Sequence, residues 1–203
     1  MHLLVLGGTG ATGRVLVEHT LAAGHSIRAL VRSPDKLPDV DSRLEVVIGE
    51  ATSQEDVKSA LSDVDAVIST LGSNTGTVLT DATRAIVAGA TANRVKRVVM
   101  LSSFAVLNDR LSFPAKLMAR LAMSAMVRDK VAAEQVLRAS DLDWMLVHAV
   151  RLANGPATGR SRVLPADTNI GLTTSISRAD VATFLLDAAT SGTFVRSEVV
   201  LGA

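Results

Sequence analysis

The sequence predicts an α/β fold in which helices cover both faces of a doubly wound parallel sheet. Short runs of apolar, often β-branched residues alternate with stretches of helical periodicity, as in sheets that are buried on both faces. A glycine-rich turn follows the first apolar run and opens the first helical stretch. The chain has 203 residues, enough for one domain with a full core, and no linker or repeat divides residues 1–203. We therefore expect a single domain.

Seven apolar runs are predicted to form the strands of this sheet. Their short length and β-branched composition favour strands over buried helices. The runs are Leu3–Leu6, Ile27–Val31, Leu44–Ile48, Ala66–Thr70, Arg97–Leu101, Trp144–His148 and Ser197–Leu201. Because helical stretches separate most consecutive runs, parallel pairing is expected.

Five stretches are predicted to be helical and to pack on the faces of the sheet. They are Arg14–Ala23, Glu55–Ser62, Val78–Asn93, Asp129–Ser140 and Ala179–Ala189. Gly24 is the expected C-cap of the first stretch, since glycine adopts the left-handed conformation easily. Ser53 with Asp56, and Ser177 with Asp180, have the spacing of capping boxes at two helix N-termini.

The last third of the chain is less regular and is expected to contribute a short irregular substrate region. This region comprises residues 150–175, with the loop-rich stretch Asn154–Thr174, together with residues 104–126. Within the latter, Phe113–Met126 carries a methionine-rich apolar face. Such a face lines a permissive pocket for a flat ligand or simply packs in the core, and both interpretations remain open.

The turn between the first strand and the first helix reads GGTGATG and predicts a Rossmann-like dinucleotide site. In such a turn Gly7 permits the tight bend, Gly10 lets the backbone approach a pyrophosphate, and Gly13 lets the helix pack closely. The helix N-terminus offers N–H groups and a partial positive charge to phosphates, and Thr9 and Thr12 add hydroxyl donors. The predicted contact residues are Gly7, Thr9, Gly10, Ala11, Thr12 and Gly13. A tight turn without a ligand is the alternative.

The end of the second strand favours NADP(H) over NAD(H). NAD sites usually carry an acidic residue about 20 residues beyond the glycines, where it binds the ribose 2′-hydroxyl. Here Arg32 stands 19 residues after Gly13, and its planar fork suits a 2′-phosphate. Lys36 supplies a second positive charge, whereas Arg28 alternates away along the strand. The alternative for Arg32 is a solvated surface side chain.

Composition excludes several other classes of function. The net charge of +1 gives no support for nucleic acid or an anionic membrane as partner. The absence of cysteine excludes disulfides, thiolate nucleophiles and cysteine-bound metals, and the four histidines show no metal-ligand spacing. No apolar run approaches the roughly 18 residues that span a bilayer. We expect a cytoplasmic protein, more often monomeric than not, that acts on a small-molecule acceptor.

Motifs along the whole chain resemble those of one enzyme group. They are GGTGATG, ALVRSPDKLP, VVIGEATSQEDV, DAVISTLGS, VKRVVMLSS, AAEQVLRASDLDWMLV and ISRADVATFLL. In order and spacing they resemble the atypical short-chain dehydrogenases that include NmrA-like proteins. Within that group the sequence is most similar to the NADPH-dependent biliverdin reductase B / flavin reductase family. The resemblance implies that Glu50–Ala51 lies along the adenine, Leu71–Gly72 along the pyrophosphate and nicotinamide ribose, and Ser102–Ser103 beside the nicotinamide.

The chain departs from most short-chain dehydrogenases at the catalytic acid. Those enzymes use a tyrosine with a lysine four residues on, but this chain has no tyrosine, and Met126 stands four residues before Lys130. A thioether cannot act as a general acid, so ketone chemistry by the usual mechanism is not expected. Biliverdin and flavin reductases also lack the pair, and they deliver hydride to a conjugated acceptor. We expect Met126 on the substrate side.

Candidate catalytic and substrate residues follow from the same resemblance, each with an ordinary structural alternative. Ser103 donates to the acceptor or the carboxamide, or it caps a turn. Lys130 binds the nicotinamide ribose or donates to the acceptor, or it pairs with Glu134 on a helix surface. Arg151 binds a propionate or phosphate, or it is a solvated loop residue, and His148 is a strand residue rather than a catalyst.

Two classes of function therefore remain open. The first is an NADPH-dependent reductase that passes hydride to a flavin, a linear tetrapyrrole or a quinone-like acceptor. The second is a non-enzymatic, NADP-binding regulator of the NmrA kind, which senses redox state and binds a protein partner. The missing tyrosine is compatible with both.

Overall fold

A single twisted sheet forms the centre of the computed structural model, which describes residues 1–37, 41–73, 76–107, 124–165, 168 and 174–203. Its strands are β1 His2–Leu6, β2 Ser26–Val31, β3 Leu44–Ile48, β4 Ala66–Ser69, β5 Arg97–Ser103, β6 Asp143–Ala149, β8 Arg162–Val163 and β10 Ser197–Gly202. Among the described residues these eight strands lie in the order β3-β2-β1-β4-β5-β6-β10-β8. Every neighbouring pair is parallel except β10 and β8. The predicted fold class is confirmed.

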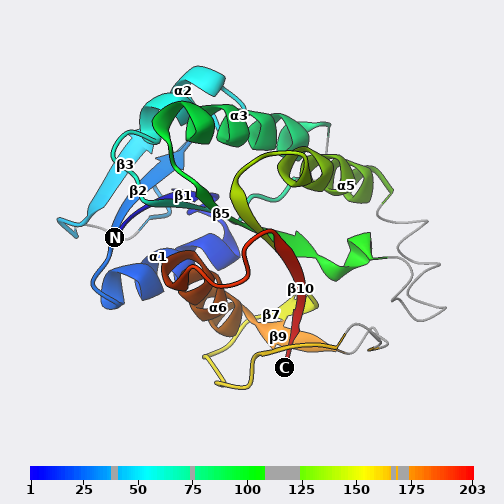
Figure 1. Cartoon of the computed structure of the whole chain (residues 1–203). Helices are drawn as coiled ribbons and strands as arrows, with labels where there is room; N and C mark the ends of the chain where they lie inside the picture. Colours follow the sequence, from blue (N-terminus) through cyan, green and yellow to red (C-terminus); the bar gives the residue numbers. More distant parts are fainter. Residues whose placement is uncertain (38–40, 74–75, 108–123, 166–167, 169–173) are drawn as a thin grey trace.

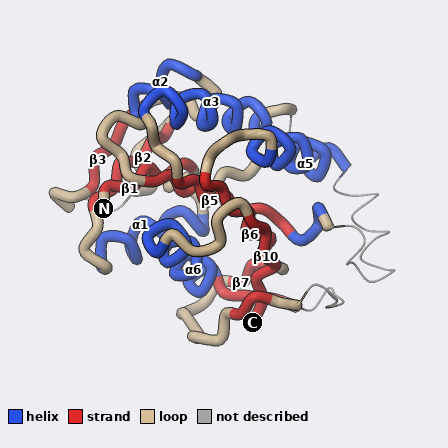
Figure 2. The backbone as a smooth tube through the Cα atoms, viewed as in Figure 1, coloured by secondary structure: helices blue, strands red, loops and turns tan. Residues whose placement is uncertain are grey.

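Helices cover both faces of the sheet, as Figure 1 shows. The longer helices are α1 Ala11–Ala22, α2 Gln54–Ala60, α3 Val78–Asn93, α5 Ser124–Arg138 and α6 Arg178–Ser191, and a short 3₁₀ helix, η1, spans Phe104–Val106. Helices α2, α3 and α5 lie on one face, whereas α1 and α6 lie together on the other (Figures 1 and 2). The result is a three-layer structure.

Alternation along the strands builds a separate core on each face. In β1, Leu3 and Val5 pack toward α1 and α6, while Leu4 and Leu6 pack toward α2 and α3. All four side chains are fully buried. Burial of one such side chain stabilises a fold by about 1.5–3 kcal/mol, so a two-sided strand contributes to both layers. This is why these strands read as continuous apolar runs.

The edge strand β3 differs from the prediction. It was expected to be buried on both faces, but Ile48 is 71% exposed and Val46 is 39% exposed. The reason is topological, because among the described strands β3 pairs with β2 alone and lies at the end of the sheet. An apolar run indicates a strand, but it does not tell an edge from the centre.

The capping predictions hold in part. Gly24 adopts a φ of +83° and its N–H bonds to the Leu21 carbonyl at 3.0 Å, so it ends α1, although Ala23 is the C-cap itself. Ser53 accepts the N–H of Asp56 at 3.2 Å, but the Asp56 carboxylate accepts the N–H of Glu50 instead of completing the box. The acid therefore ties the end of β3 to α2.

The last helix shows the same departure. Ser177 accepts the N–H of Asp180 at 2.9 Å, as predicted. The Asp180 carboxylate accepts the backbone N–H groups of Thr158 and Gly159 and the Thr158 hydroxyl. A stretch expected to be irregular is thus anchored, and β7 Arg151–Ala153 pairs in parallel with β9 Ser175–Ser177 as a second small sheet.

Candidate cofactor and substrate site

The glycine turn lies at the carboxyl ends of β1 and β4, where the strand order reverses direction. Gly7 has a φ of +83°, and a Cβ there would come within 2.9 Å of Thr70. Thr70 closes this junction by donating its hydroxyl to the carbonyls of Leu6 and Gly7, both at 3.2 Å. In open α/β sheets the ligand crevice forms at this reversal point.

Gly13 brings helix α1 onto the turn. A Cβ on Gly13 would lie only 2.0 Å from the Gly7 carbonyl oxygen, so any side chain would push the helix away. Gly10 stands between them at the N-terminus of α1, and its N–H donates to the Gly7 carbonyl at 3.0 Å. The geometry bears out the roles predicted for Gly7 in the bend and Gly13 in the close packing of the helix, whereas the approach of a pyrophosphate at Gly10 stays a prediction.

A cavity of about 500 Å³ opens at these strand ends. Its volume lies in the range of roughly 300–1,000 Å³ that is usual for small-molecule and cofactor sites. Of the residues predicted to bind the cofactor, those that line it are Gly7, Thr9, Gly10, Arg32, Lys36, Glu50, Ala51, Leu71 and Gly72. Residues from four strand ends, far apart in sequence, therefore meet in one space.

Other predicted cofactor residues lie outside the cavity lining. Ala11 is exposed in the first turn of α1, and Gly13 is buried against the glycine turn. Thr12 is buried in α1 and does not line the cavity, so its hydroxyl is not presented there in this structure. Ser102 and Ser103 lie at the end of β5, beyond the lining.

Two basic side chains face this cavity without a carboxylate partner. Arg32 and Lys36 are exposed, and within the described residues neither has an ion pair. Arg28 behaves differently, as the strand alternation predicted. Its guanidinium donates to Glu45 at 2.7 Å and to the Ala60 carbonyl at 3.1 Å, which fixes it as a structural residue.

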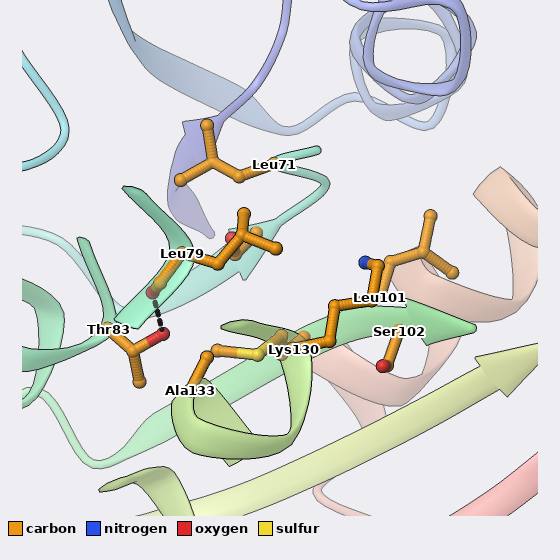
Figure 3. A pocket seen from close by; sticks show the side chains of 9 residues that line it. Leu71, Leu79, Thr83, Leu101, Ser102, Lys130 and Ala133 are labelled. Atoms are coloured by element: carbon orange, nitrogen blue, oxygen red, sulfur yellow. Dashed lines mark hydrogen bonds between the residues drawn. The ribbon is translucent and has the colours of Figure 1, made fainter. Parts of the chain in front are cut away.

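A second, much smaller cavity adjoins the first, because Leu71 lines both. Its volume is about 10 Å³, close to the space that one water molecule needs. Figure 3 shows Lys130 reaching into it from α5, with Ser102 at the end of β5 on the same side. The remaining wall is formed by Ser69, Leu71, Leu79, Thr83, Met100, Leu101 and Ala133.

Lys130 does not form the ion pair with Glu134 on a helix surface that was the alternative to a role in the site. Its proposed surface partner, Glu134, is only 1% exposed and binds Ser102, His148 and Arg138 instead. Burial lowers the pKa of the Lys130 ammonium below its ordinary value, although the carboxylates of Glu134 and Asp129 act in the opposite direction. A lysine of this kind gives up its proton more readily than a solvated one.

The two serines at the end of β5 have different partners. Ser103 accepts the N–H of Ala105 at 3.3 Å and so caps η1, while its own hydroxyl proton has no partner among the described residues. Ser102 donates its hydroxyl proton to Glu134. Ser103 is therefore compatible with both roles considered for it, since a capping hydroxyl still has a proton to donate.

The substrate-side predictions are only partly covered by the described residues. Met126 is half-buried in α5, one turn before Lys130. Arg151 is exposed in β7 rather than in a loop. Residues 108–123, which include most of the methionine-rich segment Phe113–Met126, lie outside the described residues.

Two buried acids at this site were missed by sequence reasoning. Asp129 accepts the N–H groups of Leu79 and Thr80 at 2.9 and 3.0 Å, and the Thr80 hydroxyl at 2.7 Å, so it caps the N-terminus of α3 from α5. Glu134 is the second. Apart from Arg138, which lies one turn from Glu134 on the same helix, their partners lie on other elements, so no local signal shows that the two acids are buried. Within the described part of the chain, no group of His, Cys, Asp or Glu residues has the arrangement of a metal site.

A parallel sheet with this order, a glycine turn at its reversal point and a cavity lined by Arg32 and Lys36, which have no ion pair among the described residues, define a dinucleotide-binding α/β protein. The chain belongs to the NAD(P)H-binding family, whose profile matches residues 7–191. The predicted nicotinamide cofactor is therefore confirmed at the level of the family. In the part of the chain described by the structure, no helix is long and apolar enough to cross a bilayer.

Known proteins similar to this chain include reductases and dehydrogenases. An isoflavone reductase homolog P3 from Arabidopsis thaliana is 36% identical over 143 residues, which cover 66% of this chain and 45% of the relative. The chain thus spans less than half the length of that relative. ChuY, an anaerobillin reductase from Escherichia coli O157:H7, is 25% identical with a TM-score of 0.83, over 99% of this chain and 96% of ChuY.

A short-chain dehydrogenase/reductase from Veillonella parvula, solved in complex with NADP, has the same fold. Its TM-score is 0.86 at 18% identity, and the match covers 100% of this chain and 94% of that protein.

Proposed function

We propose that this protein is an NADPH-dependent reductase that passes hydride to a conjugated, electron-poor acceptor such as a flavin, a linear tetrapyrrole or a quinone. The observation that carries the proposal is the pairing of a dinucleotide cavity with a neighbouring half-buried lysine and no phenol. The chain has no tyrosine, and Met126 stands one helical turn before Lys130. Such a site lacks the phenol that the usual alcohol–ketone chemistry employs, whereas a delocalised acceptor spreads the charge that it receives.

The residues of the two cavities have distinct roles in this proposal. Arg32 and Lys36 bind the 2′-phosphate, and the glycine turn with the N-terminus of α1 binds the pyrophosphate. NADPH supplies the hydride, and one proton from Lys130 or water completes the reduction of the acceptor. Ser103 orients the reactants by a hydrogen bond, and Arg151 binds an anionic group of the acceptor.

An assay of NADPH oxidation over a panel of acceptors tests this function. The panel contains free flavins, quinones and linear tetrapyrroles, with simple ketones as controls, and anaerobillin is included because of the similarity to ChuY. We expect turnover with at least one conjugated acceptor and none with the ketones. A primary isotope effect with deuterated NADPH is expected wherever hydride transfer limits the rate.

Efficient reduction of simple ketones, with the conjugated acceptors ignored, would refute the proposed mechanism. Tight NADPH binding with no oxidation by any acceptor would instead favour the non-enzymatic, NmrA-like regulator. The missing tyrosine is compatible with that second function as well.

A further inference from the structure

Glu134 is a buried carboxylate beside the small cavity, and the reaction proposed above assigns it no role. Only 1% of the residue is exposed. Oε1 accepts hydrogen bonds from the Ser102 hydroxyl and from Nε2 of His148, the latter at 3.0 Å. Oε2 accepts from the Arg138 guanidinium at 2.8 Å, and Glu198 binds the same arginine from the outside.

The carboxylate is held in its charged form by these donors. Burial would raise the pKa of the Glu134 carboxyl, but the hydrogen bonds from His148 and Ser102 and the Arg138 cation outweigh burial and hold the pKa below its ordinary value. An ionised carboxylate only accepts hydrogen bonds. Each of its three partners must therefore donate, and His148 carries its proton on Nε2.

The orientation of the Ser102 hydroxyl follows from this. Its single proton points at Glu134, so the oxygen presents only lone pairs to the cavity that it shares with Lys130 (Figure 3). The charged Lys130 ammonium has hydrogen-bond donors and no acceptor. The described residues show no direct hydrogen bond between the two side chains, so their complementarity acts through the space of about 10 Å³ that both line, which has room for one water molecule.

The charges around Lys130 come from few elements. Asp129 and Glu134 lie on its own helix, and both favour its charged form. From β6, His148 contacts Glu134 rather than the lysine. On α3 the described charged residues Asp81 and Arg84 pair with each other at the surface. Asp129 is itself engaged by the N-terminus of α3, which leaves Glu134 as the carboxylate that acts on both Lys130 and Ser102.

We propose that Glu134 is a positioning residue for the reductase: it takes the Ser102 proton, fixes that serine as a hydrogen-bond acceptor toward the cavity, and keeps the Lys130 ammonium beside the reacting groups. The inference rests on the proposed function, because it assumes that Lys130 and Ser102 adjoin the site of hydride transfer. Neither Glu134 nor His148 lines the cofactor cavity, and the proposal gives their hydrogen-bonded pair a role beside the small cavity instead.

Glu134→Gln removes the charge at nearly constant shape, and Glu198→Gln is its matched control. Like Glu134, Glu198 accepts hydrogen bonds from the Arg138 guanidinium, with N···O distances of 2.6 and 2.9 Å. Among the described residues it has no hydrogen bond with Ser102. We expect Glu134→Gln to lower kcat by about 10- to 100-fold with little change in KM or in the Kd of NADPH, as for a misplaced reacting group. Glu198→Gln keeps kcat within about twofold, as is usual for an exposed ion pair.

The pH profile separates positioning from a purely structural role. Loss of the Glu134 charge lowers the pKa of Lys130 further, so the alkaline limb of kcat against pH moves down by about one pH unit, as expected for one nearby opposite charge. Ser102→Ala lowers kcat as well, but leaves that limb in place because the charge remains. Ser102→Thr, which keeps the hydroxyl, restores kcat.

A double variant completes the test. If Glu134 acts through Ser102, then Glu134→Gln adds little further loss in the Ser102→Ala background. Fully additive losses, or an unmoved alkaline limb in Glu134→Gln, would overturn the proposal. Should Glu134→Gln fail to fold, the Ser102→Ala and Ser102→Thr pair decides, because kcat unchanged in Ser102→Ala refutes the role.

The titration of Lys130 can also be followed by NMR without turnover, in the wild type and in Glu134→Gln with NADP⁺ bound. Failure of the proposed function appears as a wild-type protein that reduces no acceptor in the panel. Failure of this inference appears as a Lys130 titration that Glu134→Gln leaves unchanged.

Discussion

Replacing Arg32 with alanine should weaken the binding of NADPH and leave the binding of NADH nearly unchanged. Arg32 lines the cofactor cavity at the end of β2 and has no ion pair within the described residues, so its guanidinium is available to a ligand. A charge-assisted contact with a phosphate contributes about 1.5–3 kcal/mol. Because Arg32 is exposed, we take the lower end, about 1.5 kcal/mol, which corresponds to about tenfold in Kd.

The assay is a titration of both cofactors against the wild type and the variant. We expect the Kd of NADPH to rise about tenfold and that of NADH to change by less than about twofold, since NADH lacks the phosphate. Added salt should shrink the advantage of NADPH in the wild type, because an exposed charge pair is screened.

Arg28→Ala is the control on the same strand. It removes a guanidinium that is bound to Glu45 and to the Ala60 carbonyl, so it should lower the Tm and leave the ratio of the two Kd values unchanged. Equal losses of NADPH and NADH binding in Arg32→Ala would refute the assignment of Arg32 to the 2′-phosphate.

Three further predictions concern the turn, the substrate side and the missing acid. Gly13→Ala places a Cβ 2.0 Å from the Gly7 carbonyl oxygen, so it should cost about 1–3 kcal/mol of stability by overpacking and should weaken NADPH binding. In Gly8→Ala the nearest atom to the new Cβ lies 3.5 Å away, so thermal melts and cofactor titrations should show little change. Asp180→Asn puts an amide donor against backbone N–H groups and should cost about 1–3 kcal/mol, read as a lower Tm. The hydrogen bonds of Asp180 lower its pKa in the folded state. The stability that they contribute is therefore full above the ordinary pKa of 3.8 and is lost as the pH falls through the folded pKa. We expect the wild-type Tm to fall more steeply in acid than the Tm of Asp180→Asn. Met126→Tyr restores the usual acid one turn before Lys130 and should give little gain in kcat on a conjugated acceptor; a large gain would show that a phenol had been limiting.

The sequence by itself determined the main strands and helices and the glycine turn at which the cofactor is predicted to bind. Alternating strands and helices, Gly7, Gly10 and Gly13 after the first strand, and Arg32 after the second are signals carried within a few residues of one another. Hydrophobic period and turn chemistry act locally, so they can be recognised without the fold. The absence of tyrosine can also be seen without the fold, and it argued against the tyrosine-based acid catalysis of most short-chain dehydrogenases.

Tertiary structure decided which residues the small cavity brings together. From the sequence, Lys130 could be either a partner of Glu134 in a surface ion pair or a residue of the site. The structure decides against the ion pair, because the Glu134 carboxylate binds Ser102, His148 and Arg138. Asp129 caps a helix that begins about 50 positions earlier in the chain. The contacts of Glu134 with Ser102 and His148 and those of Asp129 with α3 have no local pattern, since these partners lie on different elements.

The exposure of β3 was likewise decided by its place in the sheet. Ile48 ends an apolar run like those of the central strands, yet it is 71% exposed because nothing pairs with the outer side of β3 in the described structure. An apolar run records the chemistry of one segment, whereas burial and pKa depend on which other segments pack against it, and only the folded chain fixes those neighbours.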